Sequence, residues 1–180
     1  GQRFYTNSGF ASMGWGLPAA IGACFGNGKN RTICIAGEGG FQMTNQELAT
    51  VMHYKLPIKI FVYNNGGYLT IKQTQEINFD GRLMGSNEET GLSFPKYKEL
   101  CNAYNIKSFQ ISNQVKLSKK IDEVLEYNGP VLCELIMDRN QPNIPKSAPK
   151  KMSDGSVVRT NFEDLFPFLS EEELKSNIFK

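Results

Sequence analysis

Short apolar runs alternate with segments of helical periodicity over most of the chain. Four runs rich in β-branched residues have the length of strands buried on both faces, and they are 31–36, 58–63, 108–111 and 131–137. Apolar positions at helical spacing predict helices from about Leu17, from Thr44 to just before Pro57, and over 68–75, 95–104 and 117–127. This alternation predicts an α/β fold, with a parallel β-sheet flanked by helices on both faces.

Local signals refine the predicted elements. Thr44 and Glu47 have the spacing of a capping box, which predicts a helix start at Thr44. The polar stretch 76–93 is predicted to be a loop. From Asn140 on, Pro and Lys become frequent. We therefore expect one domain over 1–140 and an extended tail over 141–180, in which the amphipathic ending 162–179 forms a short helix that docks back.

Composition and charge exclude several classes of protein. Lys and Arg number 20 and Asp and Glu 18, a net charge of +2, which is too small for an electrostatic nucleic-acid binder. No apolar run approaches the roughly 20 residues that span a bilayer. His53 is the only histidine and no CxxC pair occurs, so a zinc site of usual spacing is excluded. We expect His53 to be solvated or packed.

The four cysteines indicate the cellular compartment, and the first residue indicates whether the chain is part of a longer one. Cys34 and Cys133 lie inside apolar runs, where a thiol acts as a small hydrophobe. We therefore expect reduced cysteines and a cytoplasmic protein. The chain begins at Gly1 without a signal peptide, so we expect it to be a piece of a longer polypeptide.

Two predicted strand ends carry candidate chemistry. In parallel sheets, ligands bind beyond the carboxyl ends of the strands. Gly37-Glu38-Gly39-Gly40 follows one strand and Asn64-Asn65-Gly66-Gly67 follows the next. The glycines let N–H groups approach a phosphate, and the carboxylate, amide and carbonyl oxygens suit Mg²⁺. Taken singly, the first motif is equally compatible with a tight turn, and the second is most often just a turn; the third glycine of a dinucleotide loop is absent. Together they predict a magnesium-bridged diphosphate site.

The run G37-E-G-G-F-Q-M-T-N-Q-E-L-A-T followed by N64-N65 resembles the thiamine diphosphate-binding motif. The upstream run S12-M-G-W-G-L-P-A-A-I-G-A is similar to the segment that precedes this motif in acetolactate synthases and related decarboxylases. The resemblance covers residues 7 to about 137. It implies the diphosphate-binding (PP) domain of a thiamine diphosphate enzyme, with thiamine diphosphate and Mg²⁺ as cofactors.

The resemblance also implies roles for single positions. The metal ligands would be Glu38, Asn65 and the Gly67 carbonyl oxygen. Met13 would wedge under the cofactor, and the Ala11 carbonyl would accept a hydrogen bond from the aminopyrimidine; without the flanking match, packing at a helix start would explain Met13. The other implied cofactor contacts are Ser12, Gly37, Gly39, Gly40, Tyr68 and Leu69. The implied substrate-facing residues are Thr70, Ile71 and Thr74.

Several positions depart from the family pattern. Glu38 stands where the family has Asp, and Gly40 where a Ser is usual, which bears on how tightly the cofactor binds. The helix after Asn65 has Thr74 at the place of a Trp in acetolactate synthases. It has Ile71 at the place of a proton-transferring Glu in pyruvate decarboxylases. We therefore expect carboligation rather than simple decarboxylation, with an acceptor that is larger or more polar.

The resemblance implies decarboxylation of a 2-oxo acid and transfer of the two-carbon fragment to a carbonyl acceptor. No position matches the Glu that activates the pyrimidine ring, so no catalytic residue is expected in this chain. That Glu would come from the pyrimidine-binding domain of a neighbouring chain in a homo-oligomer, a dimer or tetramer. The chain alone should be inactive, and its tail would act as an active-site lid. The alternatives are a 2-oxo acid decarboxylase domain and a degenerate module without catalysis.

Overall fold

The computed structural model describes residues 1–142, 144–152 and 154–178. The chain divides into two compact units, Gly1–Arg139 and Asn140–Lys180.

The first unit is built on a four-stranded sheet. Its strands are β1 (Thr32–Gly37), β2 (Ile58–Asn64), β3 (Lys107–Ile111) and β4 (Val131–Ile136). Their order is β1-β2-β4-β3, and every neighbouring pair is parallel. Gly37 is in register with Tyr63, and Asn64 with Ile136, so the carboxyl ends of β1, β2 and β4 lie at one edge.

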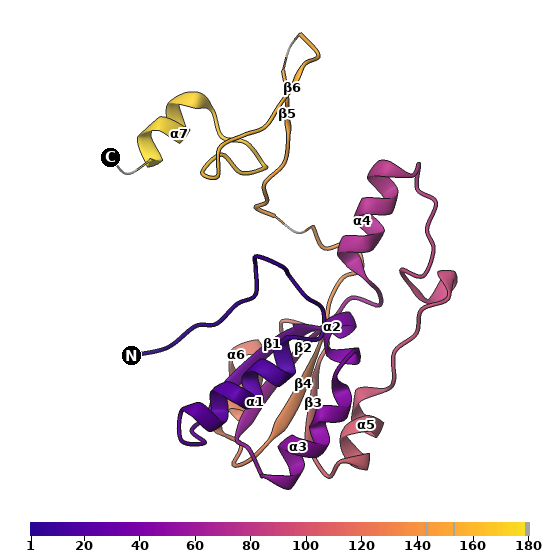
Figure 1. Ribbon diagram of the computed structural model, residues 1–180, viewed down its shortest axis with the longest axis vertical. Coiled ribbons are helices and arrows are strands. Elements are labelled where there is room, and N and C mark those ends of the chain that lie inside the picture. Colours follow the sequence, from indigo (N-terminus) through magenta and orange to yellow (C-terminus); the bar gives the residue numbers. More distant parts are fainter. Residues whose placement is uncertain (143, 153, 179–180) are drawn as a thin grey trace. The chain divides into compact units, whose positions relative to one another are not determined.

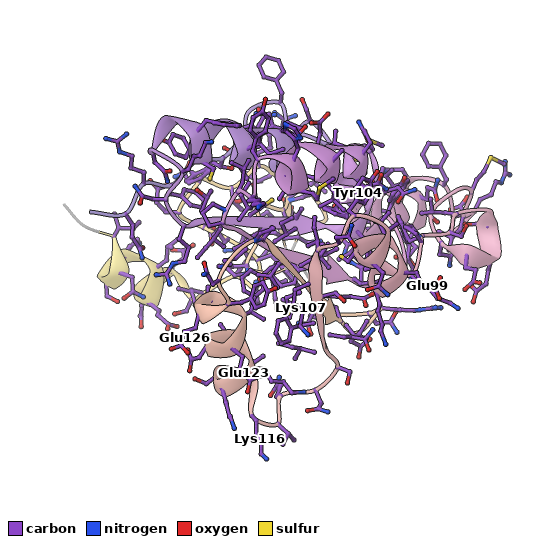
Figure 2. All side chains as sticks on the ribbon, turned by 90° about the horizontal axis from the view of Figure 1, so that it is seen from below. Glu99, Tyr104, Lys107, Lys116, Glu123 and Glu126 are labelled. Carbon is purple, nitrogen blue, oxygen red and sulfur yellow. The ribbon has the colours of Figure 1, made fainter. Side chains whose placement is uncertain are left out.

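Helices cover both faces of this sheet, which confirms the predicted α/β fold. One face packs against α1 (Gly16–Gly26), α2 (Glu38–Gln42), α3 (Leu48–His53) and α5 (Tyr97–Ala103). The other face packs against α6 (Leu117–Glu126). Figure 1 shows α1 in front of the sheet and α6 behind it. In Figure 2, α6 carries the exposed Glu123 and Glu126 on the side of the sheet opposite α1.

The predicted capping box at Thr44 is wrong. The helix after β1 begins at Glu38, and residues Asn45–Glu47 form a single 3₁₀ turn, η1, before α3. The Thr44 side chain caps no helix. Its hydroxyl donates instead to the Gly14 carbonyl oxygen at 3.0 Å, and the Glu47 carboxylate accepts from the Thr50 hydroxyl at 3.0 Å. The Thr44 hydroxyl, which local spacing assigned to a helix cap, thus bonds to a residue 30 positions away in the sequence.

The helix after Asn65 is longer than predicted. Helix α4 covers Leu69–Asn78, so three residues of the expected loop are helical. The rest of that loop contains a 3₁₀ turn, η2 (Glu88–Thr90). The Asn87 side chain accepts from the Thr90 N–H at 3.1 Å and caps this turn. The segment after α4 is therefore ordered by its own polar side chains.

All four cysteines are free and buried, as expected. They lie on α1, β1, α5 and β4, as Cys24, Cys34, Cys101 and Cys133. Within the described ranges, no helix is both long and apolar enough to cross a membrane.

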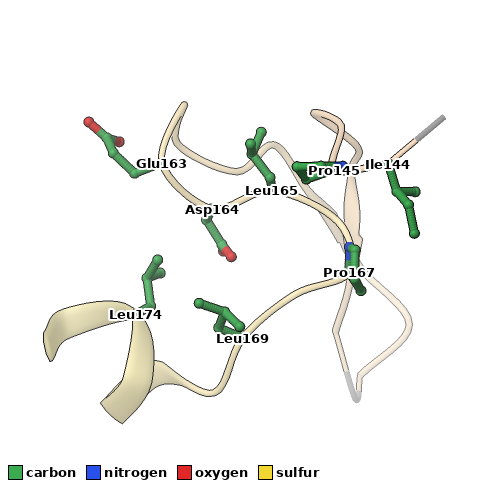
Figure 3. Close-up of a pocket in the computed structure, with 8 residues that line it drawn as sticks. All are labelled: Ile144, Pro145, Glu163, Asp164, Leu165, Pro167, Leu169 and Leu174. Atoms are coloured by element: carbon green, nitrogen blue, oxygen red, sulfur yellow. The ribbon is translucent and has the colours of Figure 1, made fainter. Parts of the chain in front are cut away.

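The second unit contains a two-stranded antiparallel ribbon, β5 (Lys150–Lys151) with β6 (Val157–Val158), and the helix α7 (Glu171–Asn177). Ser170 caps α7 by accepting from the Glu173 N–H at 3.2 Å. A mainly apolar cavity of about 430 Å³ lies within this unit, with Asp164, Leu169 and Leu174 among its lining residues (Figure 3). The expected amphipathic ending is thus helical over α7, while Phe179 lies outside the described residues.

Candidate functional site

The two strand-end motifs meet at the carboxyl edge of the sheet. Glu38 is the first residue of α2, directly after β1, and its side chain is 1% exposed. Its Oε1 atom accepts from the backbone N–H groups of Asn65 and Gly67, both at 2.9 Å. The structure therefore joins the Glu38 carboxylate to the loop that follows β2. The three residues predicted to bind metal lie next to one another.

Two opposing effects act on the pKa of the Glu38 carboxyl group. Burial raises the pKa of its carboxyl group above the ordinary value. The N–H groups of Gly67, Glu38 itself, Asn65 and Gly66 oppose this shift, because their dipoles favour the charged form. The site thus provides an oxygen donor surrounded by N–H groups at the end of a strand.

Two glycines make close approaches that a side chain would prevent. A Cβ at Gly39 would lie 2.5 Å from the Tyr68 ring and 2.9 Å from the terminal methyl of Met13. A Cβ at Gly67 would lie 2.3 Å from the Ser86 carbonyl oxygen. Met13, Gly39 and Tyr68 therefore form one contact group beside Glu38. By contrast, a Cβ at Gly40 would come no closer than 3.7 Å to the Gly14 nitrogen, and Gly37 has open space.

A turn before α1 brings Met13 to this site. The Ala11 N–H donates to the Asn7 carbonyl at 2.7 Å, and Ala11 has φ +50°. Ser12 follows in the same turn, where its carbonyl accepts from the Trp15 N–H at 3.4 Å. The Thr44 bond to Gly14 fixes the end of this turn against the residues after α2. Ala11, Ser12 and Met13 are all exposed.

The predicted substrate-facing residues lie on α4, which starts at Leu69. The Thr74 hydroxyl donates to the Thr70 carbonyl at 2.9 Å, within the helix, and Ile71 is 39% exposed. A narrow pocket borders the Asn65–Leu69 loop, and the α4 residues that line it are Leu69 and Lys72. The structure thus places Lys72, rather than Thr70, Ile71 or Thr74, at the pocket next to the metal-ligand candidates.

Sequence reasoning missed two polar residues close to the loop, Glu134 and Arg139. Glu134 on β4 accepts from the Asn64 side chain at 2.6 Å and from the Gln110 side chain at 2.7 Å. Arg139 lies close to Gly66, because a Cβ added at Gly66 would be 3.0 Å from the Arg139 Nε atom. A single acidic residue inside the apolar run Val131–Ile136 is the signal that could have identified Glu134.

The donor set fits Mg²⁺ by its chemistry. Across the residues with described positions, no three His, Cys, Asp or Glu side chains gather as a metal site. The candidate set is of another kind, with one carboxylate, one amide oxygen and one backbone carbonyl at Glu38, Asn65 and Gly67. All three are oxygen donors, which Mg²⁺ prefers, and a metal with few protein ligands keeps water and phosphate oxygens.

Comparison with known proteins identifies the class. Residues 1–135 match the family described as "Thiamine pyrophosphate enzyme, C-terminal TPP binding domain". This match covers more than half of the chain, so the protein belongs to that family. The thiamine diphosphate-binding fold predicted from the two motifs is thereby confirmed.

Within the family, the chain is similar to acetolactate synthases. It is 37% identical over 149 residues to the acetolactate synthase large subunit of Cyanidium caldarium, which covers 83% of this chain and 25% of that protein. It is 35% identical over 150 residues to the large subunit of Porphyra purpurea, with the same coverage. It is 33% identical over 150 residues to the isozyme 2 large subunit of Escherichia coli strain K12, covering 82% of this chain and 27% of that protein. The chain therefore spans about a quarter of the length of these relatives.

Proposed function

We propose that this chain is the magnesium- and diphosphate-binding domain of an acetolactate synthase-like enzyme. The whole enzyme would decarboxylate a 2-oxo acid and transfer the two-carbon fragment to a carbonyl acceptor. One observation carries the proposal: the Glu38 carboxylate lies against the Asn65–Gly67 loop, with its Oε1 2.9 Å from two loop nitrogens. The residues of the two motifs are thus adjacent, which supports a shared metal.

The residues of this chain would bind and orient the cofactor. Glu38, Asn65 and the Gly67 carbonyl would hold Mg²⁺, and Gly39 and Gly40 would bring backbone close to the diphosphate. Met13 would support the cofactor from below, and the Ala11 carbonyl would accept from its pyrimidine. Bound thiamine diphosphate supplies the electron sink for decarboxylation.

The remaining parts of the active site would come from outside this chain. We propose that a neighbouring chain of a homo-oligomer supplies the pyrimidine-binding domain and its activating Glu. The C-terminal tail, residues 141–180, would act as a lid over the site. The four buried free thiols support a reducing, cytoplasmic compartment.

Calorimetric titration with thiamine diphosphate tests the proposal. We expect heat of binding with Mg²⁺ present and none with EDTA. Asn65→Ala should weaken binding by at least about tenfold, which corresponds to about 1.4 kcal/mol, because it removes one metal ligand. Glu126→Gln, an exposed change on α6, is the control and should bind like the wild type. Absence of magnesium-dependent heat, in this chain and in the complete enzyme, would refute the proposal.

A non-catalytic module is the second candidate. The observation in its favour is that Glu38 and Gly40 stand where the family pattern has Asp and Ser. If so, Glu38→Asp should restore magnesium-dependent binding that the wild type lacks. Product analysis with pyruvate, with and without an added aldehyde, then separates a carboligase from a simple decarboxylase in the complete enzyme.

A further inference from the structure

Glu134 is an acidic residue buried in an otherwise apolar strand. It is 9% exposed and lies on β4, between β2 and β3. One carboxylate oxygen accepts from Asn64 Nδ2 at 2.6 Å, and the other accepts from Gln110 Nε2 at 2.7 Å. The carboxylate therefore links three strands at the edge where the candidate site lies. A buried charge of this kind needs such partners to be tolerated.

The bond to Glu134 fixes the orientation of the Asn64 amide. An ionised carboxylate can only accept hydrogen bonds, so Asn64 must turn its NH₂ group toward it. The Asn64 Oδ1 atom then faces the other way and accepts from the Gly66 N–H at 3.0 Å. Glu134 thus determines which atom of Asn64 faces the loop.

The bond from Gly66 completes the hydrogen bonding of the loop. Gly66 has φ +77°, a conformation that few other residues adopt. The N–H groups on either side of it, at Asn65 and Gly67, donate to Glu38. Three successive N–H groups therefore have side-chain acceptors, which two residues from different strand ends supply. Asn64 provides the acceptor for the middle N–H group, and Glu38 provides it for the outer two.

We propose that Glu134 is a positioning residue for the Asn65–Gly67 loop and acts through Asn64. It holds the Asn64 amide so that the turn at Gly66 is formed before any ligand arrives. Its relevance to magnesium and diphosphate binding rests on the function proposed above for that loop. The order of the loop itself does not depend on that function, so the two can be tested separately.

Two disruptive variants and one compensating pair provide a sharp test. Glu134→Leu removes the acceptor, so the Asn64 amide keeps only its bond from the Gly66 N–H and loses the one that fixes its NH₂ group. In Asn64→Asp alone, two carboxylates face each other. When Asn64→Asp is combined with Glu134→Gln, the introduced amide donates to the introduced carboxylate, and its oxygen accepts from Gln110. The introduced carboxylate still accepts from the Gly66 N–H, so all three hydrogen bonds can form again.

The readout is amide hydrogen exchange by NMR on the 180-residue chain. Each single variant should speed exchange at Gly66 by at least about tenfold relative to Val62, a buried amide of β2. The double variant should bring Gly66 back to within about threefold of the wild type. A purely structural role would speed exchange at Gly66 and Val62 alike. Equal effects at the two amides, or no recovery in the double variant, would overturn the proposal.

Two further measurements keep the test decisive. If a single variant does not fold, the double variant still tests the proposal. Fast exchange at Gly66 in the double variant would contradict the proposed geometry. Gln110→Met removes only the second donor to Glu134 and should leave Gly66 exchange close to wild type. Magnesium-dependent binding of thiamine diphosphate is measured separately. If wild-type binding is absent while exchange responds as expected, the positioning role stands and the proposed function fails.

Discussion

Gly67 has no room for a side chain. A Cβ at this position would lie 2.3 Å from the Ser86 carbonyl oxygen, and that oxygen also accepts from the Tyr68 N–H at 2.8 Å. Because the obstructing atom belongs to the backbone, the chain must move to admit a methyl group. We expect Gly67→Ala to lower the free energy of unfolding by about 1–3 kcal/mol, measured by urea denaturation.

Gly37 is the matched control for this change. It lies at the end of β1 with φ −74° and has nothing within 4 Å of an added Cβ. Gly37→Ala should therefore change the free energy of unfolding by no more than about 0.5 kcal/mol. Equal losses in the two variants would contradict the steric argument.

Three buried thiols make the fold sensitive to alkaline pH. Burial raises the pKa of Cys34 and Cys101 from 9.0 to about 12, and that of Cys133 to about 11. Above pH 9 the unfolded chain loses these protons while the folded chain keeps them, so stability falls as pH rises. Each thiol adds up to about 1.4 kcal/mol per pH unit to this slope. The lowered pKa of Lys59 acts in the opposite sense below its ordinary 10.5.

Urea denaturation at pH 8, 9 and 10 checks the expected slope. Stability should change little between pH 8 and pH 9 and then fall steeply. Cys34→Ala should show a shallower fall above pH 9 than the wild type, because one of the three thiols is gone. A flat profile up to pH 10 would show that the thiols ionise similarly in both states.

Single residues were predictable where a general rule placed them. Glu38 and Asn65 could be paired from sequence, because adjacent parallel strands end at the same edge. The approach of Met13 and Tyr68 to Gly39 could not, since it depends on the turn before α1 as well as on the two strand ends. Thr44 was assigned to a cap from local spacing, yet it bonds to Gly14. The metal and cofactor roles themselves stay predictions.

Among the elements, α6 is joined to the sheet by a buried lysine. Lys59 on β2 is 2% exposed, and its ammonium group donates to the carbonyls of Tyr127 and Gly129, just after α6. Lys59→Met keeps the apolar stem but leaves both carbonyls without this donor. We expect a loss of about 1–3 kcal/mol in the free energy of unfolding.

Thermal and urea unfolding of Lys59→Met measure this loss. Lys119→Met, an exposed change within α6, is the control and should stay within about 0.5 kcal/mol of wild type. A well-tolerated Lys59→Met would show that water replaces the ammonium group at the end of α6.

The limits of α4 show why element boundaries escape sequence rules. Its last residues were predicted to be loop because they are polar. The Gln75 side chain, however, donates to the Met84 carbonyl at 2.9 Å and accepts from the Met84 N–H at 3.1 Å. These bonds bring the returning chain against the helix and support its final turn. Propensity within a short window contains no information on a partner nine residues away.

At the scale of the whole molecule, alternation of strands and helices was sufficient to predict the fold class. The strand order was not predictable in the same way. β4 lies between β2 and β3, and the clearest sign of this place in its own sequence is Glu134. At this central position, Glu134 accepts hydrogen bonds from Asn64 on one neighbouring strand and from Gln110 on the other.

The reactivity of the four buried thiols reports when each face of the sheet becomes exposed during unfolding. Cys24, Cys34 and Cys101 belong to the core on one face of the sheet, and Cys133 belongs to the core on the other. A thiol reagent followed by peptide mass spectrometry therefore reads the two faces separately, without any introduced label. We expect all four to become reactive at the same urea concentration. Labelling of Cys133 alone at a lower urea concentration would show that α6 separates from the sheet before the other face is exposed.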